Sequence, residues 1–138
     1  MTSYLLDSGF LYATVDESDA HHVSVIAATK RIRGEVLLPI PAITETAYFL
    51  AKNRGVNYLA TFLKDLPNSK FELVAPTDFD YIRSAEILRK YNDANIDFVD
   101  ACIVAMAERL NITKILTVDR RHFQIFRPKH CKSFEIIP

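Results

Sequence analysis

Short apolar runs alternate with longer amphipathic segments along almost the whole chain, and this alternation limits the possible folds more than any other feature. Buried strands that alternate with helices are typical of an α/β domain whose mainly parallel sheet is covered on both faces. The length of 138 residues suits a single domain. We therefore predict one α/β domain over residues 1–138, with about five strands. The runs expected to form strands are 3–6, 36–40, 71–75, 115–118 and 134–137.

Capping residues and helix breakers set the expected limits of the helices. Asp19 precedes an apolar stretch, so we expect it to be the N-cap of a helix that Gly34 closes. Pro41 suits the first turn of the next helix, and Gly55 is expected to end it. Thr77 is expected to cap a later helix. The expected helical segments are 10–16, 21–33, 41–54, 56–66, 77–91 and 95–110.

Four acidic residues border or interrupt the apolar runs, where an ionised carboxylate is costly. Asp7 and Asp119 directly follow two runs, Glu45 begins the helix after another, and Asp100 lies inside an apolar helix. No Lys or Arg lies within a few residues of the first three of these acids along the chain, Asp7, Glu45 and Asp100. Buried carboxylates are normally protonated, paired or bound to a metal. Because ligands bind at the carboxyl ends of parallel strands, we expect the four acids to meet there.

A divalent cation is the obvious counter-charge for such a cluster. Oxygen ligands without His or Cys companions favour Mg²⁺ or Mn²⁺ over zinc. Asp97, three residues before Asp100, is a further candidate ligand, although its place before a helix also suits an N-cap. A cation held by carboxylates and waters commonly acts on phosphate substrates, where it can activate a water molecule.

Each acid also has an ordinary structural explanation. Asp7 lies in an Asp-Ser-Gly sequence that is common in turns. Glu45 suits the first turn of a helix, where the helix dipole favours acids, and Asp119 suits an N-cap position. Asp100 is different, because nearly all its neighbours from 98 to 107 are apolar.

The overall charge argues against one class of nucleic-acid-binding protein. The chain has 17 Lys and Arg against 17 Asp and Glu, so it does not coat nucleic acid by bulk charge. A local basic patch is still compatible with this balance. Arg120 and Arg121 are the best candidates for contacts with RNA phosphates, because they adjoin Asp119. A solvated surface explains the same two residues equally well.

The sequence lacks the signals of secretion, membrane insertion and disulfide cross-linking. The N-terminus has no basic region followed by a long apolar run, and no run approaches the length of a membrane span. Cys102 and Cys131 form neither a disulfide framework nor a metal-binding spacing. We expect a cytoplasmic protein that does not enter a membrane.

Taken in order, these residues resemble the PIN domain family, and in particular the VapC-type toxin ribonucleases of VapBC toxin–antitoxin systems. The resemblance covers nearly the whole chain. It rests on an acid after the first strand, a Glu in the helix after the second, an Asp-Ala pair in an apolar helix and an acid after a late strand. The four motifs are Leu6-Asp7-Ser8, Thr44-Glu45-Thr46, Val99-Asp100-Ala101 and Val118-Asp119-Arg120.

The resemblance implies a three-layer α/β/α sandwich and an endoribonuclease that cleaves RNA with a water molecule activated by Mg²⁺ or Mn²⁺. It also implies the roles of individual residues. Asp97 would be an optional fifth ligand, while Ser8 and Thr117 would support the acids through hydrogen bonds. The acids implied to be both catalytic and metal-binding are Asp7, Glu45, Asp100 and Asp119.

Partners follow from the same resemblance. It implies an RNA substrate, a homodimer and a small cognate antitoxin that binds a groove on the helices of residues 42–66, although core packing explains most apolar residues there equally well. One alternative is a PIN-domain nuclease that processes RNA outside any toxin–antitoxin pair. Another is a non-catalytic PIN-like binding module, against which the complete set of four acids argues.

Overall fold

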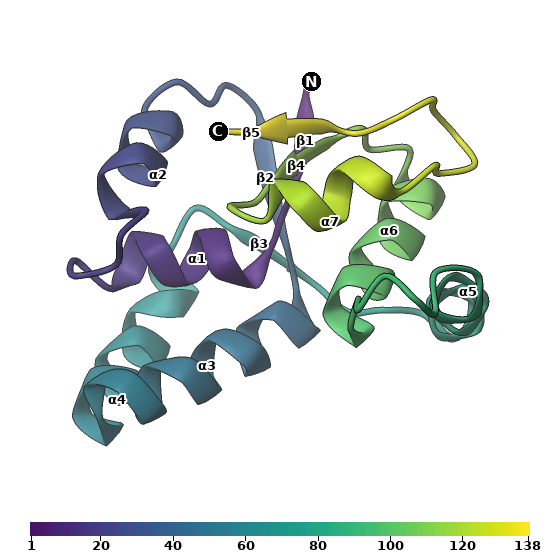
Figure 1. Ribbon diagram of the computed structural model, residues 1–138. Helices are drawn as coiled ribbons and strands as arrows, with labels where there is room; N and C mark the ends of the chain where they lie inside the picture. The colour runs from purple at the N-terminus through teal and green to yellow at the C-terminus, as the bar shows by residue number, and fades with distance from the viewer.

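A parallel sheet of five strands in the order β3-β2-β1-β4-β5 forms the centre of the computed structural model, which describes residues 1–138 (Figure 1). β1 lies in the middle and pairs with β2 on one side and β4 on the other. All five predicted strands form close to their expected positions, so the predicted parallel α/β sheet is confirmed. The strands are β1 (Ser3–Leu6), β2 (Glu35–Pro39), β3 (Glu72–Val74), β4 (Lys114–Leu116) and β5 (Glu135–Ile137).

Helices cover both faces of this sheet. In Figure 1, α1 and α2 lie to the left of the strands, and α5 and α6 lie to the right. This is the three-layer α/β/α arrangement that the resemblance implies. The helices are α1 (Ser8–Val15), α2 (His22–Thr29), α3 (Ile40–Arg54), α4 (Val56–Asp65), the 3₁₀ turn η1 (Leu66–Asn68), α5 (Asp78–Lys90), α6 (Phe98–Leu110) and α7 (Arg120–Ile125).

One core contains buried residues of β1, β4 and α6. Leu5 and Leu6 of β1 and Ile115 of β4 are fully buried. Every residue of α6 from Val99 to Ala107 is buried, which fits a helix that is apolar on all sides. Asp100 lies inside this stretch and is itself buried. No helix of the structure is both long enough and apolar enough to span a membrane.

Two expectations about the second helix are wrong. Asp19 is not its N-cap: α2 begins at His22, and the Asp19 side chain instead accepts a hydrogen bond from the His21 backbone in the preceding turn (2.9 Å). Gly34 does not close the helix, which ends at Thr29. Gly34 has a φ of +144°, and a Cβ there would lie 2.1 Å from the Thr2 carbonyl oxygen, so glycine lets the chain pass close to the N-terminus before β2.

Two further differences concern the helices near the acids. α6 begins at Phe98 rather than at residue 95, because Asn95 has a left-handed φ of 58° and Asp97 is extended. No helix is predicted after residue 118, yet α7 forms there. Six residues are too few to show a clear apolar period, so the sequence pattern does not reveal this helix.

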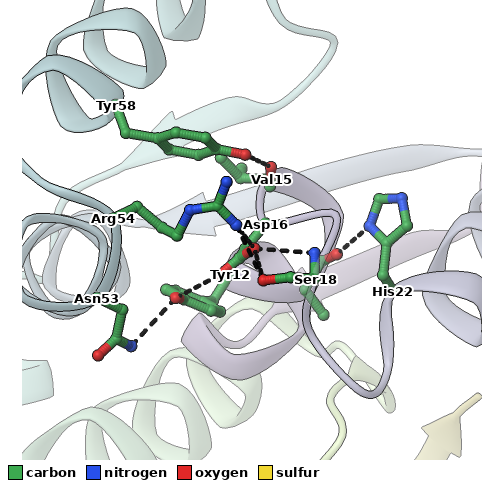
Figure 2. A network of polar contacts seen from close by, with 9 residues as sticks. Tyr12, Val15, Asp16, Ser18, His22, Asn53, Arg54 and Tyr58 are labelled. Atoms are coloured by element: carbon green, nitrogen blue, oxygen red, sulfur yellow. Dashed lines mark hydrogen bonds and ion pairs between the residues drawn. The ribbon is translucent and has the colours of Figure 1, made fainter.

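A buried carboxylate ties the end of α1 to the junction of α3 and α4 (Figure 2). Asp16 accepts hydrogen bonds from the hydroxyls of Tyr12 and Ser18 (both 2.7 Å) and from the Arg54 guanidinium (2.7 Å). Burial alone would raise the pKa of Asp16, but these hydrogen bonds and the Arg54 charge outweigh burial and lower the pKa to about 2. Arg54 also lies over the ring of Tyr58, 4.6 Å from its centroid.

Two ion pairs join α5 to α6. Asp80 is fully buried, and Arg109 donates to both of its carboxylate oxygens at 2.8–3.0 Å. Arg83 makes a similar bidentate pair with Glu108 (2.7 and 3.0 Å). Because these pairs satisfy charges that the helix contact buries, removal of one partner leaves the other uncompensated.

We expect Arg109→Ala to lower the free energy of unfolding by about 2 kcal/mol, because it leaves the Asp80 carboxylate buried without its counter-charge. Urea denaturation at pH 7 measures this change. Arg89→Ala is the matched control, since Arg89 is exposed on α5. Equal stability of the two variants would show that the Asp80–Arg109 pair contributes nothing.

Candidate active site

The four predicted acids line one hollow of about 380 Å³ at the carboxyl edge of the sheet. Asp7 follows β1, Asp119 lies between β4 and α7, Glu45 is in α3, and Asp100 is in the first turn of α6. Asp97, His21 and His122 line the same hollow. These residues are spread over more than a hundred positions of the sequence, and the parallel sheet brings them together.

Asp7 is held from two sides. Its side chain caps α1, with Oδ1 accepting from the Ser8 backbone N–H (2.8 Å), while Oδ2 accepts from the Thr117 hydroxyl (2.8 Å). The same Thr117 oxygen accepts from the backbone N–H of Asp119 (2.9 Å), so one buried hydroxyl links two of the acids. The Ser8 hydroxyl donates to Glu45. The two hydroxyls predicted to support the acids therefore both contact them.

Asp97 and Asp100 form a reciprocal capping box at the start of α6. The Asp97 carboxylate accepts from the Asp100 backbone N–H (2.9 Å), and the Asp100 carboxylate accepts from the Asp97 backbone N–H (3.2 Å). Asp97 is thus the N-cap that its position suggests, and it also lies close enough to Glu45 to raise the pKa of that residue.

His122 is a site residue that sequence reasoning missed. Asp119 caps α7 by accepting from the His122 backbone N–H (3.1 Å), which fixes the imidazole beside the acid. Its Nδ1 atom lies 2.8 Å from Asp119 Oδ2 and 3.3 Å from Asp100 Oδ2. From the sequence we expect only oxygen ligands around the acids, without a histidine, and this expectation is therefore wrong. The spacing Asp-x-x-His was the available signal, because an N-cap and the third residue of its helix lie side by side.

Burial and mutual repulsion make the cluster electrostatically costly. Burial, opposed by hydrogen bonds from Thr117 and Ser8, raises the pKa of Asp7 to about 6. Burial and the nearby charges of Asp97 and Asp7 raise the pKa of Asp100 to about 8. No Lys or Arg forms an ion pair with any acid of the hollow. The donor set therefore fits a divalent cation, which would supply the missing positive charge.

The two predicted arginines, Arg120 and Arg121, begin α7 beside Asp119 but do not line the hollow. The Arg120 guanidinium donates to the carbonyl of Pro138, the last residue of the chain. Arg121 is exposed and makes no ion pair. His22, the chain neighbour of His21, has its Nδ1 atom 2.6 Å from the Ala13 carbonyl oxygen, a contact between α2 and α1.

Comparison with known proteins identifies the architecture. Residues 4–127 match the family described as PIN domain. The chain belongs to the PIN domain family. This PIN domain is also 29% identical over 134 residues to Ribonuclease VapC26 of Mycobacterium tuberculosis. The match covers 97% of this chain and 99% of that protein. The predicted family resemblance is thereby confirmed.

Solved structures share the fold at low sequence identity. The M. tuberculosis toxin VapC20, described as cleaving the sarcin-ricin loop, superposes with a TM-score of 0.75 and 18% identity, over 81% of this chain and 86% of that one. VapBC2 from Rickettsia felis, solved with a DNA fragment of its promoter, gives a TM-score of 0.70 and 15% identity, over 99% of this PIN domain and 100% of that chain.

We expect Asp100→Asn to stabilise the cation-free protein at high pH. The folded-state pKa of about 8 lies above the ordinary value of about 3.9, so the charged form penalises the fold fully above pH 8. The penalty disappears as pH falls from 8 towards the ordinary value. In EDTA at pH 8.5, the variant should melt higher than wild type by at least about 3 °C, the shift that about 1 kcal/mol produces in a domain of this size, and the difference should shrink by pH 5.

Asp93→Asn is the control for this comparison, because Asp93 is exposed and outside the hollow. Its melting temperature relative to wild type should not depend on pH. An Asp100→Asn protein that is less stable than wild type at every pH would contradict the assignment of electrostatic strain to this residue.

Proposed function

We propose that this PIN domain is a Mg²⁺- or Mn²⁺-dependent endoribonuclease and the toxin of a type II toxin–antitoxin pair. The observation that carries the proposal is the meeting of Asp7, Glu45, Asp100 and Asp119 in one hollow where no Lys or Arg neutralises them. A relative named as a ribonuclease, matched along almost the whole chain, supports the reaction class.

All five acids line the hollow, so we assign them together: Asp7, Asp100 and Asp119 would hold the cation, joined by Glu45 and by Asp97 as a fifth ligand. When bound, Mg²⁺ or Mn²⁺ would lower the pKa of a water molecule and stabilise the negative charge of the phosphate under attack. Cleavage of this type leaves a 5′-phosphate and a 3′-hydroxyl.

The chain's own side chains would orient the acids and take a proton from the attacking water. The Thr117 hydroxyl holds the Asp7 carboxylate, and the Ser8 hydroxyl holds Glu45. Glu45 is half-buried, and burial and Asp97 raise its pKa, which favours its acceptance of a proton. We propose that Glu45 takes the proton of the attacking water.

The catalytic test is cleavage of a total-RNA pool by purified protein with Mg²⁺, with Mn²⁺ and with EDTA. We expect cleavage only with a cation, and losses of at least about 100-fold in Asp7→Asn and Asp100→Asn, because each removes a charged ligand. Asp93→Asn should cleave like wild type. If folded wild-type protein free of antitoxin cleaves nothing with either cation, a non-catalytic binding module becomes the better explanation.

Arg120 and Arg121 are the proposed contacts with RNA phosphates. Both are exposed, and both follow Asp119 directly at the start of the helix that it caps. We expect Arg121→Ala to weaken binding of RNA to a cleavage-deficient Asp7→Asn protein and to reduce the slope of binding against salt. Arg89→Ala, in the last turn of α5, should leave RNA binding and its salt slope unchanged. An unchanged salt slope in Arg121→Ala would remove this residue from the RNA interface.

Protein partners are the third part of the proposal. The solved neighbours include the toxin–antitoxin pairs VapBC2 of R. felis and FitAB bound to DNA, and we propose a cognate antitoxin for this chain in the cytoplasm. On α3 and α4, Tyr48, Val56 and Leu63 are exposed and available to an antitoxin, whereas Leu50 and Phe62 belong to the core.

A homodimer is proposed through α5. Phe79 and Ile82 of this helix are each 65% exposed, so two large apolar side chains are available to a second copy of the chain. Light scattering of the purified protein distinguishes a dimer from a monomer of 15.7 kDa.

A further inference from the structure

His122 has an unusual environment for a histidine at the edge of a hollow. Its Nδ1 atom is buried, with carboxylate oxygens on two sides of it, and the contact of 2.8 Å with Asp119 Oδ2 lacks the alignment of a hydrogen bond. The other unpartnered buried side-chain nitrogen in the structure, on His130, lies outside the hollow. A buried nitrogen without a partner normally costs free energy, so its position calls for a ligand that can use it.

The distances around Nδ1 match the spacing of ligands on one cation. Neighbouring ligands in an octahedral shell with bonds of about 2.1 Å lie about 3 Å apart. Nδ1 is 2.8 Å from Asp119 Oδ2 and 3.3 Å from Asp100 Oδ2. One ligand atom from each of Asp100, Asp119 and His122 lies within 4.8 Å of the other two, which allows all three to reach a single ion.

The position of the imidazole is fixed before any ion arrives. The N-cap bond from the His122 backbone N–H to Asp119 Oδ1 (3.1 Å) sets the first turn of α7. The capping box at Asp97 and Asp100 does the same for α6. Two helix starts therefore hold the two carboxylates and the imidazole in one place, and little ordering is needed on binding.

We propose that His122 Nδ1 is a direct ligand of the catalytic cation and makes the site prefer Mn²⁺ over Mg²⁺. This inference rests on the proposed function. Mg²⁺ selects oxygen ligands and gives up its waters reluctantly, whereas an imidazole nitrogen suits transition ions, and Mn²⁺ accepts both kinds of ligand. The structure thus changes the expectation from the sequence, in which an all-oxygen site takes Mg²⁺ and Mn²⁺ alike.

The test uses full-length, EDTA-treated protein and the cations alone. Pulsed electron paramagnetic resonance of the Mn²⁺-loaded wild type should show coupling to a directly bound imidazole ¹⁴N, and His122→Asn should lose it. Calorimetric titration should show Mn²⁺ affinity above Mg²⁺ affinity in wild type. In His122→Asn, Mn²⁺ affinity should fall about tenfold or more, with a much smaller change for Mg²⁺.

The control is His21→Asn, since His21 lines the same hollow but lies outside the group of three ligands. It should keep both the ¹⁴N coupling and the Mn²⁺ affinity. Mn²⁺-loaded wild type without imidazole coupling would overturn the inference and leave the proposed nuclease intact, and the wild-type spectrum settles this even if a variant fails to fold. Wild type that binds neither cation and cleaves no RNA would overturn the proposed function itself.

Discussion

Concentration of carboxylates at one buried edge is the constraint on which the rest of the structure depends. The fold offsets part of its cost with backbone N–H groups, because three helices begin at the cluster. Asp7 caps α1, Asp97 caps α6 and Asp119 caps α7. Each cap places a negative charge at the positive end of a helix, where it is favoured. Burial and the remaining negative charge still raise the pKa values of Asp7 and Asp100. The proposed divalent cation would balance that charge.

Contacts away from the cluster keep these helix starts in place. The Asp16–Arg54 pair joins the far end of α1 to the end of α3, the helix that carries Glu45. Tyr12 and Asn53 belong to the same hydrogen-bonded group and also line the hollow, so this network reaches the site directly. On the other side, the Asp80–Arg109 pair fixes α6, which carries Asp100, against α5. A change in Arg54 or Arg109 should therefore alter the site without replacing any acid that lines the hollow.

The sequence was sufficient for the features that follow from parallel-sheet geometry. Asp7 and Asp119 come after strands, and parallel strands end at one edge, so their meeting was predictable. His122 was not predicted, because it depends on α7, a helix with too few residues to show a period. Gly34 was misassigned because a glycine after a helical stretch usually ends it, whereas here the Thr2 carbonyl leaves no space for a side chain.

The Asp7–Thr117 hydrogen bond joins residues 110 positions apart, and it has a consequence for synthesis of the chain. Asp7 and Glu45 emerge from the ribosome early, but the partners that complete the hollow belong to the last strands and helices. A nascent or truncated chain thus carries half of the acids and no assembled site. If the protein cleaves RNA, that cleavage requires a chain that has been synthesised at least through Asp119.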